Sequence, residues 1–170
     1  HVRHLAALRP WDLISVFSPE LAGNEAKRAA IGALDERVLV CTRLEDCLRD
    51  ADVVALCTSS GTPVIAEDRL TKPALITSIS TNVANAHEIP PAWLPGMEVY
   101  CDYRPTTPGS AGEMKLAAQL HDWSPDRVLG DLPELVSGMA RKPSGQQHVF
   151  FRSIGLGLED VAIANELFRH

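Results

Sequence analysis

The chain has 170 residues, of which 45% are hydrophobic and 22% charged, as expected for one soluble globular domain. Its formal net charge of −6 argues against partners such as nucleic acid or an anionic membrane surface. No apolar run approaches the roughly 20 residues of a membrane-spanning helix, and no secretory signal is visible.

The four cysteines form no CxxC pair, which disfavours a redox or zinc motif. They are Cys41, Cys47, Cys57 and Cys101. We expect buried free thiols and therefore a cytoplasmic protein, because the cytosol is reducing.

The first eight residues have apolar side chains at helical spacing, at positions 2, 5, 6 and 8. No capping residue precedes them, although a helix start usually shows one. The pattern indicates a helix with further chain on its N-terminal side. The alternative is a helix that frays at a natural terminus.

Strands and helices are predicted to alternate along the rest of the chain. The strands are Leu13–Phe17, Val38–Cys41, Val53–Cys57, Ala74–Ile79, Met97–Cys101 and Val149–Arg152. The helices are Glu20–Leu34, Leu44–Arg49, Ala111–Leu120, Pro133–Met139 and Leu158–Phe168. This order predicts the α/β class, with a Rossmann-like, doubly wound, mostly parallel sheet that has helices on both faces.

Two local predictions follow from the residues themselves. Val53–Cys57 contains no polar residue, so this strand is expected to be buried on both faces. Thr42 and Glu45 have the spacing of a capping box at the start of the predicted helix Leu44–Arg49. The proline- and glycine-rich stretches are interpreted as loops within one domain.

Small polar residues follow three of the predicted strands, where ligands bind in open α/β sheets. They lie in Thr58–Pro63, Ser78–Asn82 and Ser153–Gly155. Each segment alone is also typical of an ordinary turn. Together they suggest one crevice with a neutral, hydrogen-bonding lining, which suits a nucleotide or nicotinamide ring better than a metal.

The end of the first strand bears on the choice of cofactor. In NAD-binding domains the second strand ends in an acid that bonds the ribose 2′-hydroxyl, and in this chain Ser18 holds that place. Ser18, with Lys27 and Arg28 on the next helix, slightly favours NADP over NAD. The alternative is that both cations simply face solvent.

The histidines point to no metal site. His1 and His4 are three residues apart, but no third ligand is evident. His87 is the best acid–base candidate by position, with a surface residue at a helix start as the alternative.

Five motifs in chain order resemble the ornithine cyclodeaminase/μ-crystallin family, and the terminal one is quite specific. They are Asp50-Ala51-Asp52-Val53-Val54, Thr58-Ser59, Ser80-Thr81-Asn82 with Glu88, Val99–Asp102, and Phe151-Arg152-Ser153-Ile154-Gly155 with Glu159-Asp160. The resemblance covers nearly the whole chain. It implies that residues 1–170 are an incomplete NAD(P)-binding Rossmann domain, truncated at its N-terminal strand, whose substrate and dimerisation domain lies upstream.

The resemblance also implies roles for individual residues. Cofactor contacts are expected at Ser18, Thr58, Ser59, Ile79, Ser80, Thr81, Asn82 and Ser153. Substrate contacts are expected at Ile154 and Gly155. No metal ligand is implied.

The implied activity is hydride transfer to a cyclic 2-imino acid such as Δ1-pyrroline-2-carboxylate, or the reverse oxidation of an amino acid. Cyclodeaminases have an aspartate acid–base group where this chain has Asn82. An amide takes up no proton near neutral pH, which disfavours ornithine cyclodeamination. That lyase activity and a non-catalytic, μ-crystallin-like binding protein remain the alternatives.

The sequence assigns no catalytic residue. The family implies a homodimer for the full-length protein. Residues 1–170 alone are expected to be inactive and to bind dinucleotide weakly, because a central strand and the pyrophosphate loop would be upstream.

Overall fold

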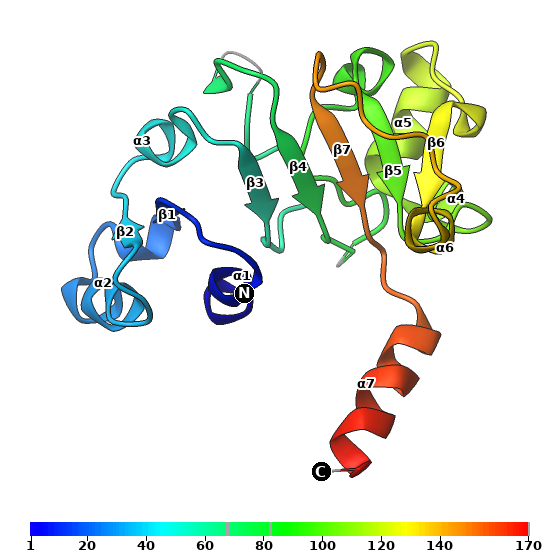
Figure 1. The fold of residues 1–170 in the computed structure, drawn as a ribbon. Coiled ribbons are helices and arrows are strands. Elements are labelled where there is room, and N and C mark those ends of the chain that lie inside the picture. Colours follow the sequence, from blue (N-terminus) through cyan, green and yellow to red (C-terminus); the bar gives the residue numbers. More distant parts are fainter. Residues whose placement is uncertain (67–68, 82, 170) are drawn as a thin grey trace. The chain divides into compact units, whose positions relative to one another are not determined.

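The computed structural model describes residues 1–66, 69–81 and 83–169 (Figure 1). The chain divides into two compact units, His1–Ala51 and Asp52–His170. Strands alternate with helices in both units, and every strand pair in the described residues is parallel. The predicted α/β class with a parallel sheet is therefore confirmed.

The first unit contains a two-stranded parallel sheet. Its elements are α1 (Val2–Leu8), β1 (Ile14–Val16), the 3-10 helix η1 (Pro19–Leu21), α2 (Glu25–Gly32), β2 (Val38–Val40) and α3 (Leu44–Leu48). The predicted helix from Glu20 starts later, because the Asn24 side chain accepts a hydrogen bond from the Lys27 amide at 2.9 Å and caps α2. The predicted Thr42 cap is wrong: α3 begins after Arg43, and no side chain caps it.

The second unit contains a five-stranded parallel sheet in the order β3-β4-β7-β5-β6. Its strands are β3 (Val53–Leu56), β4 (Leu75–Ser78), β5 (Glu98–Cys101), β6 (Val128–Asp131) and β7 (Val149–Arg152). Its helices are η3 (Pro91–Gly96), α4 (Thr107–Ser110), α5 (Gly112–Leu120), η4 (Pro125–Arg127), α6 (Leu132–Ser137) and α7 (Gly157–Arg169).

The last strand of the chain lies in the middle of this sheet. β7 pairs with β4 on one side and with β5 on the other, as Figure 1 shows. Ile76 on β4 and Phe150 on β7 have no exposed surface, and Val99 on β5 is almost as buried. These apolar side chains form a core at the centre of the sheet, so the end of β7 is held between two neighbouring strands.

Several expectations about this unit are corrected. β3 pairs only with β4 among the described strands, and its Ala55 is exposed, so the strand is not buried on both faces. β6 was missed because Gly130 and Asp131 interrupt its apolar pattern. α4 was missed because its residues, Thr107–Ser110, are typical of a turn.

The thiols are all free, but they are not uniformly buried. Cys41 and Cys101 are buried, Cys47 is half-buried and Cys57 is exposed. Cys57 is exposed because it lies just beyond the last residue of β3, at the edge strand. Within residues 1–66, 69–81 and 83–169, no helix has both the length and the apolar character to cross a bilayer.

Candidate functional site

The three polar loops of the sequence prediction follow three neighbouring strands. Leu56 at the end of β3 lies in register with Ser78 on β4, and Ser78 lies in register with Arg152 on β7. The strands are parallel, so the loops that leave them meet at one edge of the sheet, where ligands bind in such folds.

A buried carboxylate joins the first two loops. Glu88 has no exposed surface, and its Oε1 accepts hydrogen bonds from the Thr58 amide and hydroxyl, at 2.8 and 2.7 Å. Its Oε2 accepts from the Ser78 hydroxyl at 2.7 Å and from the amides of Ile79 and Ser80 at 3.1 and 3.3 Å. Glu88 therefore fixes the two loops against one another.

The charge state of Glu88 follows from these contacts. Burial alone would raise the pKa of this carboxyl group, but the hydrogen bonds from Thr58, Ser78 and Ile79 outweigh it and lower the pKa. Glu88 is thus an anion near neutral pH, and the surrounding amide and hydroxyl donors stabilise its charge.

A second buried carboxylate holds the loop after β7. Asp102 follows β5 and has no exposed surface. Its Oδ2 accepts from the amides of Ile154 and Gly155, at 2.7 and 3.0 Å, and from the Ser153 hydroxyl at 3.1 Å. Gly155 has a φ of +78°, a conformation that favours glycine.

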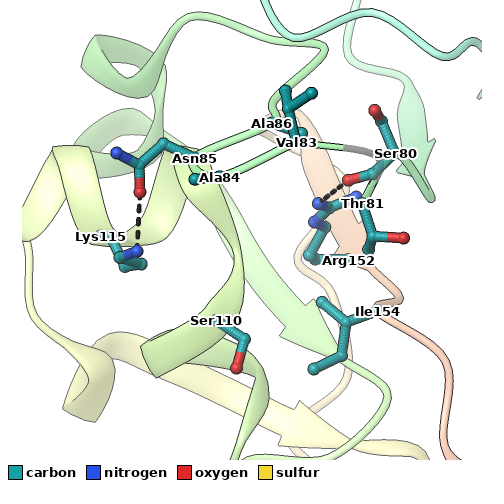
Figure 2. Close-up of a pocket in the computed structure, with 10 residues that line it drawn as sticks. All are labelled: Ser80, Thr81, Val83, Ala84, Asn85, Ala86, Ser110, Lys115, Arg152 and Ile154. Atoms are coloured by element: carbon teal, nitrogen blue, oxygen red, sulfur yellow. Dashed lines mark hydrogen bonds between the residues drawn. The ribbon is translucent and has the colours of Figure 1, made fainter.

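The loops after β4 and β7 border a pocket of about 440 Å³, shown in Figure 2, whereas no residue of Thr58–Pro63 is among its described lining. Its described lining is Ser80, Thr81, Val83, Ala84, Asn85, Ala86, Ser110, Lys115, Arg152 and Ile154. Hydroxyl and apolar groups predominate, two side chains are cationic, and no carboxylate is in this set. Such a lining suits a flat, partly apolar ligand that carries an anionic group.

Arg152 approaches the pocket from the end of β7 and is 1% exposed. Its Nη1 donates to the Ser78 hydroxyl at 3.1 Å, and its Nη2 donates to the Ser80 carbonyl, the contact dashed in Figure 2. Its Nε lies 2.9 Å from Oε1 of Glu113, on the first turn of α5. Burial raises the pKa of Glu113, and the positive charge of Arg152 opposes that rise.

Glycine allows α5 to approach the pocket wall closely. A Cβ on Gly112 would lie 2.2 Å from the carbonyl oxygen of Asn85 and 2.5 Å from that of Ala86. Asn85 has a φ of +59° and accepts a hydrogen bond from Lys115 Nζ at 2.7 Å. The helix start and the wall are therefore in direct backbone contact.

The predicted site residues fall into distinct groups. Ser80, Thr81 and Ile154 line the pocket. The structure does not place the remaining predicted contacts of this unit in the described lining: Thr58, Ile79, Ser153 and Gly155 bond to the two buried carboxylates, and Ser59 is exposed. Asn82 lies outside the described residues.

Ser18 lies in the first unit, between β1 and η1. Lys27 pairs with Glu20 at 2.9 Å, which lowers the pKa of Glu20. Arg28 donates to the carbonyls of Leu21 and Ala22 at 2.7 and 2.9 Å. Both cations therefore have partners close to Ser18, and the predicted preference for NADP stays a prediction.

His87 has a ring nitrogen 2.7 Å from the Asn85 carbonyl and is not among the pocket-lining residues. The described residues contain no group of three potential His, Cys, Asp or Glu metal ligands.

The sequence assigned no site role to Arg152, Glu113 or Lys115. The available signal was Arg152 itself, since an arginine that ends a buried apolar strand needs a partner.

Comparison with known proteins identifies relatives along the whole chain. Residues 2–169 match the profile of the ornithine cyclodeaminase/mu-crystallin family. The NAD(P)H-dependent anabolic L-arginine dehydrogenase of Pseudomonas aeruginosa is 52% identical over 99% of this chain and 53% of its own length. The iminosuccinate reductase of Paracoccus denitrificans is 27% identical over 89% of this chain and 47% of its length.

A solved structure shares the fold. The probable ornithine cyclodeaminase of Bordetella pertussis superposes with a TM-score of 0.80 at 26% identity, over 99% of this chain and 54% of that one. The chain thus spans about half the length of these relatives.

Proposed function

The chain belongs to the ornithine cyclodeaminase/mu-crystallin family, and on that basis we propose that the complete protein is an NAD(P)H-dependent oxidoreductase. It reduces the C=N bond of a 2-imino acid or, in reverse, oxidises the corresponding amino acid. The observation that carries the proposal is the 52% identity to an NAD(P)H-dependent L-arginine dehydrogenase across 99% of the chain. An arginine-like substrate is therefore the first candidate, ahead of a cyclic imine.

The chemistry of the pocket fits a nicotinamide ring. Val83 and Ile154 offer apolar surface, and the hydroxyl groups of Ser80, Thr81 and Ser110 offer hydrogen bonds to an amide. When bound there, the reduced ring supplies the hydride. The preference for NADP over NAD remains part of the proposal.

The residues of this chain hold the pocket walls in position and bind the substrate. The carboxylates of Glu88 and Asp102 hold the loops after β3, β4 and β7, so the hydroxyls that line the pocket keep fixed positions. Lys115 gives the pocket positive charge, which suits the carboxylate of an imino acid.

The experiment uses the full-length protein. Oxidation of NADPH and of NADH is followed with 2-oxo-5-guanidinovalerate plus ammonium, and separately with Δ1-pyrroline-2-carboxylate. Turnover with the first substrate at higher kcat/KM supports the arginine assignment, and turnover only with the second supports the cyclic imine. Residues 1–170 alone are expected to give no turnover.

Two outcomes would contradict the proposal. Conversion of ornithine to proline and ammonia with no net consumption of nicotinamide would make the protein a cyclodeaminase. Tight dinucleotide binding without turnover of any imino or amino acid would make it a binding protein.

A further inference from the structure

A buried ion pair lies directly beneath the pocket. The Glu113 and Arg152 side chains are 0% and 1% exposed, and Oε1 of one lies 2.9 Å from Nε of the other. A buried pair of this kind contributes little net stability compared with well-packed apolar residues. Its presence therefore calls for a reason other than stability.

Glu113 depends on Arg152 for its partner. Within the part of the chain that the structure describes, neither of its carboxylate oxygens receives a hydrogen bond of good geometry. The backbone of Glu113 and the His87 side chain also lower the pKa of Glu113, and Glu88 raises it, but each of these effects is smaller than that of Arg152. The Arg152 guanidinium is thus the main group that stabilises the anionic carboxylate.

Arg152 in turn reaches the pocket wall. Its two terminal nitrogens donate to the Ser78 hydroxyl and to the Ser80 carbonyl, and both Arg152 and Ser80 line the pocket (Figure 2). Ser80 begins a segment that supplies most of the described pocket lining, and we call its residues 80–81 and 83–86 the pocket loop. A rotation of the guanidinium would remove its contact with the Ser80 carbonyl and leave the start of this loop held by the bonds of Ser80 to Glu88 and Ser60.

The planar guanidinium has a fixed fork of donors, so its orientation decides which groups it can bond. The contact at Nε leaves Nη1 and Nη2 facing Ser78 and Ser80. Without a carboxylate at Nε, the guanidinium could turn and lose one of its two contacts with the loop.

We propose that Glu113 is a positioning residue of this site: it orients Arg152, and Arg152 fixes the pocket loop. The catalytic part of the inference rests on the proposed function. Glu113 is not itself among the residues that line the pocket, and its ion pair with Arg152 connects it to that lining.

The test compares Glu113→Gln with the wild type in the full-length protein. Glutamine keeps the shape and cannot carry a negative charge. We expect kcat for the imino acid to fall about 10- to 100-fold, while the Kd of the dinucleotide changes less than about threefold. Equal falls in kcat and in dinucleotide affinity, at a temperature where both proteins are folded, would overturn the proposal.

Glu134→Gln is the matched control. Glu134 pairs with Arg104 at 2.6 Å in the same unit but outside the pocket lining. This variant should lose some stability and keep the kcat of the wild type. A fall in kcat as large as that of Glu113→Gln would mean that any lost ion pair has this effect, which would overturn the positioning role.

A double-mutant cycle tests the route through Arg152. Glu113→Gln added to Arg152→Met should give no further fall in kcat, because the group on which it acts is gone. If the fall in kcat of the double variant equals the product of the two single falls, Glu113 acts by a route that does not involve Arg152. If Arg152→Met does not fold, Arg152→Lys takes its place in the same cycle.

Hydrogen exchange separates this proposal from the proposed function. Glu113→Gln should speed amide exchange in the pocket loop and leave β5 unchanged, whether or not the protein reduces imino acids. Unchanged exchange in the loop would overturn the positioning role even if the wild type is an active reductase.

Discussion

Glu88 illustrates how one side chain organises the site. It accepts hydrogen bonds from the loops after two strands, and no part of it is exposed. A buried carboxylate is stabilised only when donors replace the water that it has lost. The five donors around Glu88 come from Thr58, Ser78, Ile79 and Ser80, so the network forms only when both loops are in place.

We expect Glu88→Gln to destabilise the protein by about 2–4 kcal/mol near neutral pH, because the amide group cannot accept from all these donors. The pKa of Glu88 is lower in the folded state than its ordinary value of 4.5. Its contribution is therefore present above pH 4.5 and lost as the pH falls through the folded-state pKa.

Urea denaturation at a series of pH values measures this difference. The free energies of unfolding of wild type and variant should converge on the acid side. A gap that stays constant with pH would contradict the assigned ionisation of Glu88.

At the scale of elements, the pocket depends on how closely α5 approaches residues 85–86. The carbonyls of Asn85 and Ala86 occupy the space of a Cβ on Gly112. The contact is with backbone atoms, which cannot rotate away as a flexible side chain can. A larger residue must displace either the helix or the wall of the pocket.

Gly112→Ala should therefore lower the free energy of unfolding by about 1–3 kcal/mol and raise KM for the ligand that enters the pocket. Gly157→Ala at the start of α7 is the control, since no atom lies within 4 Å of its added Cβ. Thermal unfolding and steady-state kinetics of both variants measure the effects. Identical behaviour of the two variants would show that α5 can shift at no cost.

At the scale of the whole molecule, the two units differ in their cores. The buried hydrophobic residues of the first unit are Leu21, Cys41 and Leu48, and the rest of the described core belongs to the second. The first unit has a sheet of only two strands, whereas the second has five. Few buried contacts predict low local stability.

In residues 1–170 expressed alone, amides of β1 and β2 should exchange faster with solvent than those of β5 and β7. Hydrogen exchange followed by mass spectrometry resolves the two sets. Equal protection in both sheets would indicate that the two units unfold as one cooperative body.

The sequence alone determined the elements whose pattern is local. Three apolar residues followed by Arg152 predicted the bounds of β7, Val149–Arg152. The alternation of strands and helices predicted the α/β class. The polar residues predicted after three strands include lining residues of the pocket only after β4 and β7. The sequence pattern did not predict β6, because Gly130 and Asp131 are not apolar and are buried by neighbouring elements.

Only the tertiary structure decided which residues act together. Glu88 and Thr58 are 30 residues apart, and Ser78 and Arg152 are 74 apart. Their contacts follow from the strand order, which places β4 beside β7. A periodic pattern reports which face of an element is buried, but the partner of a buried charge is set by the packing of distant segments. For this reason the family could be read from the motifs, whereas the role of Arg152 and Glu113 became visible only in the folded chain.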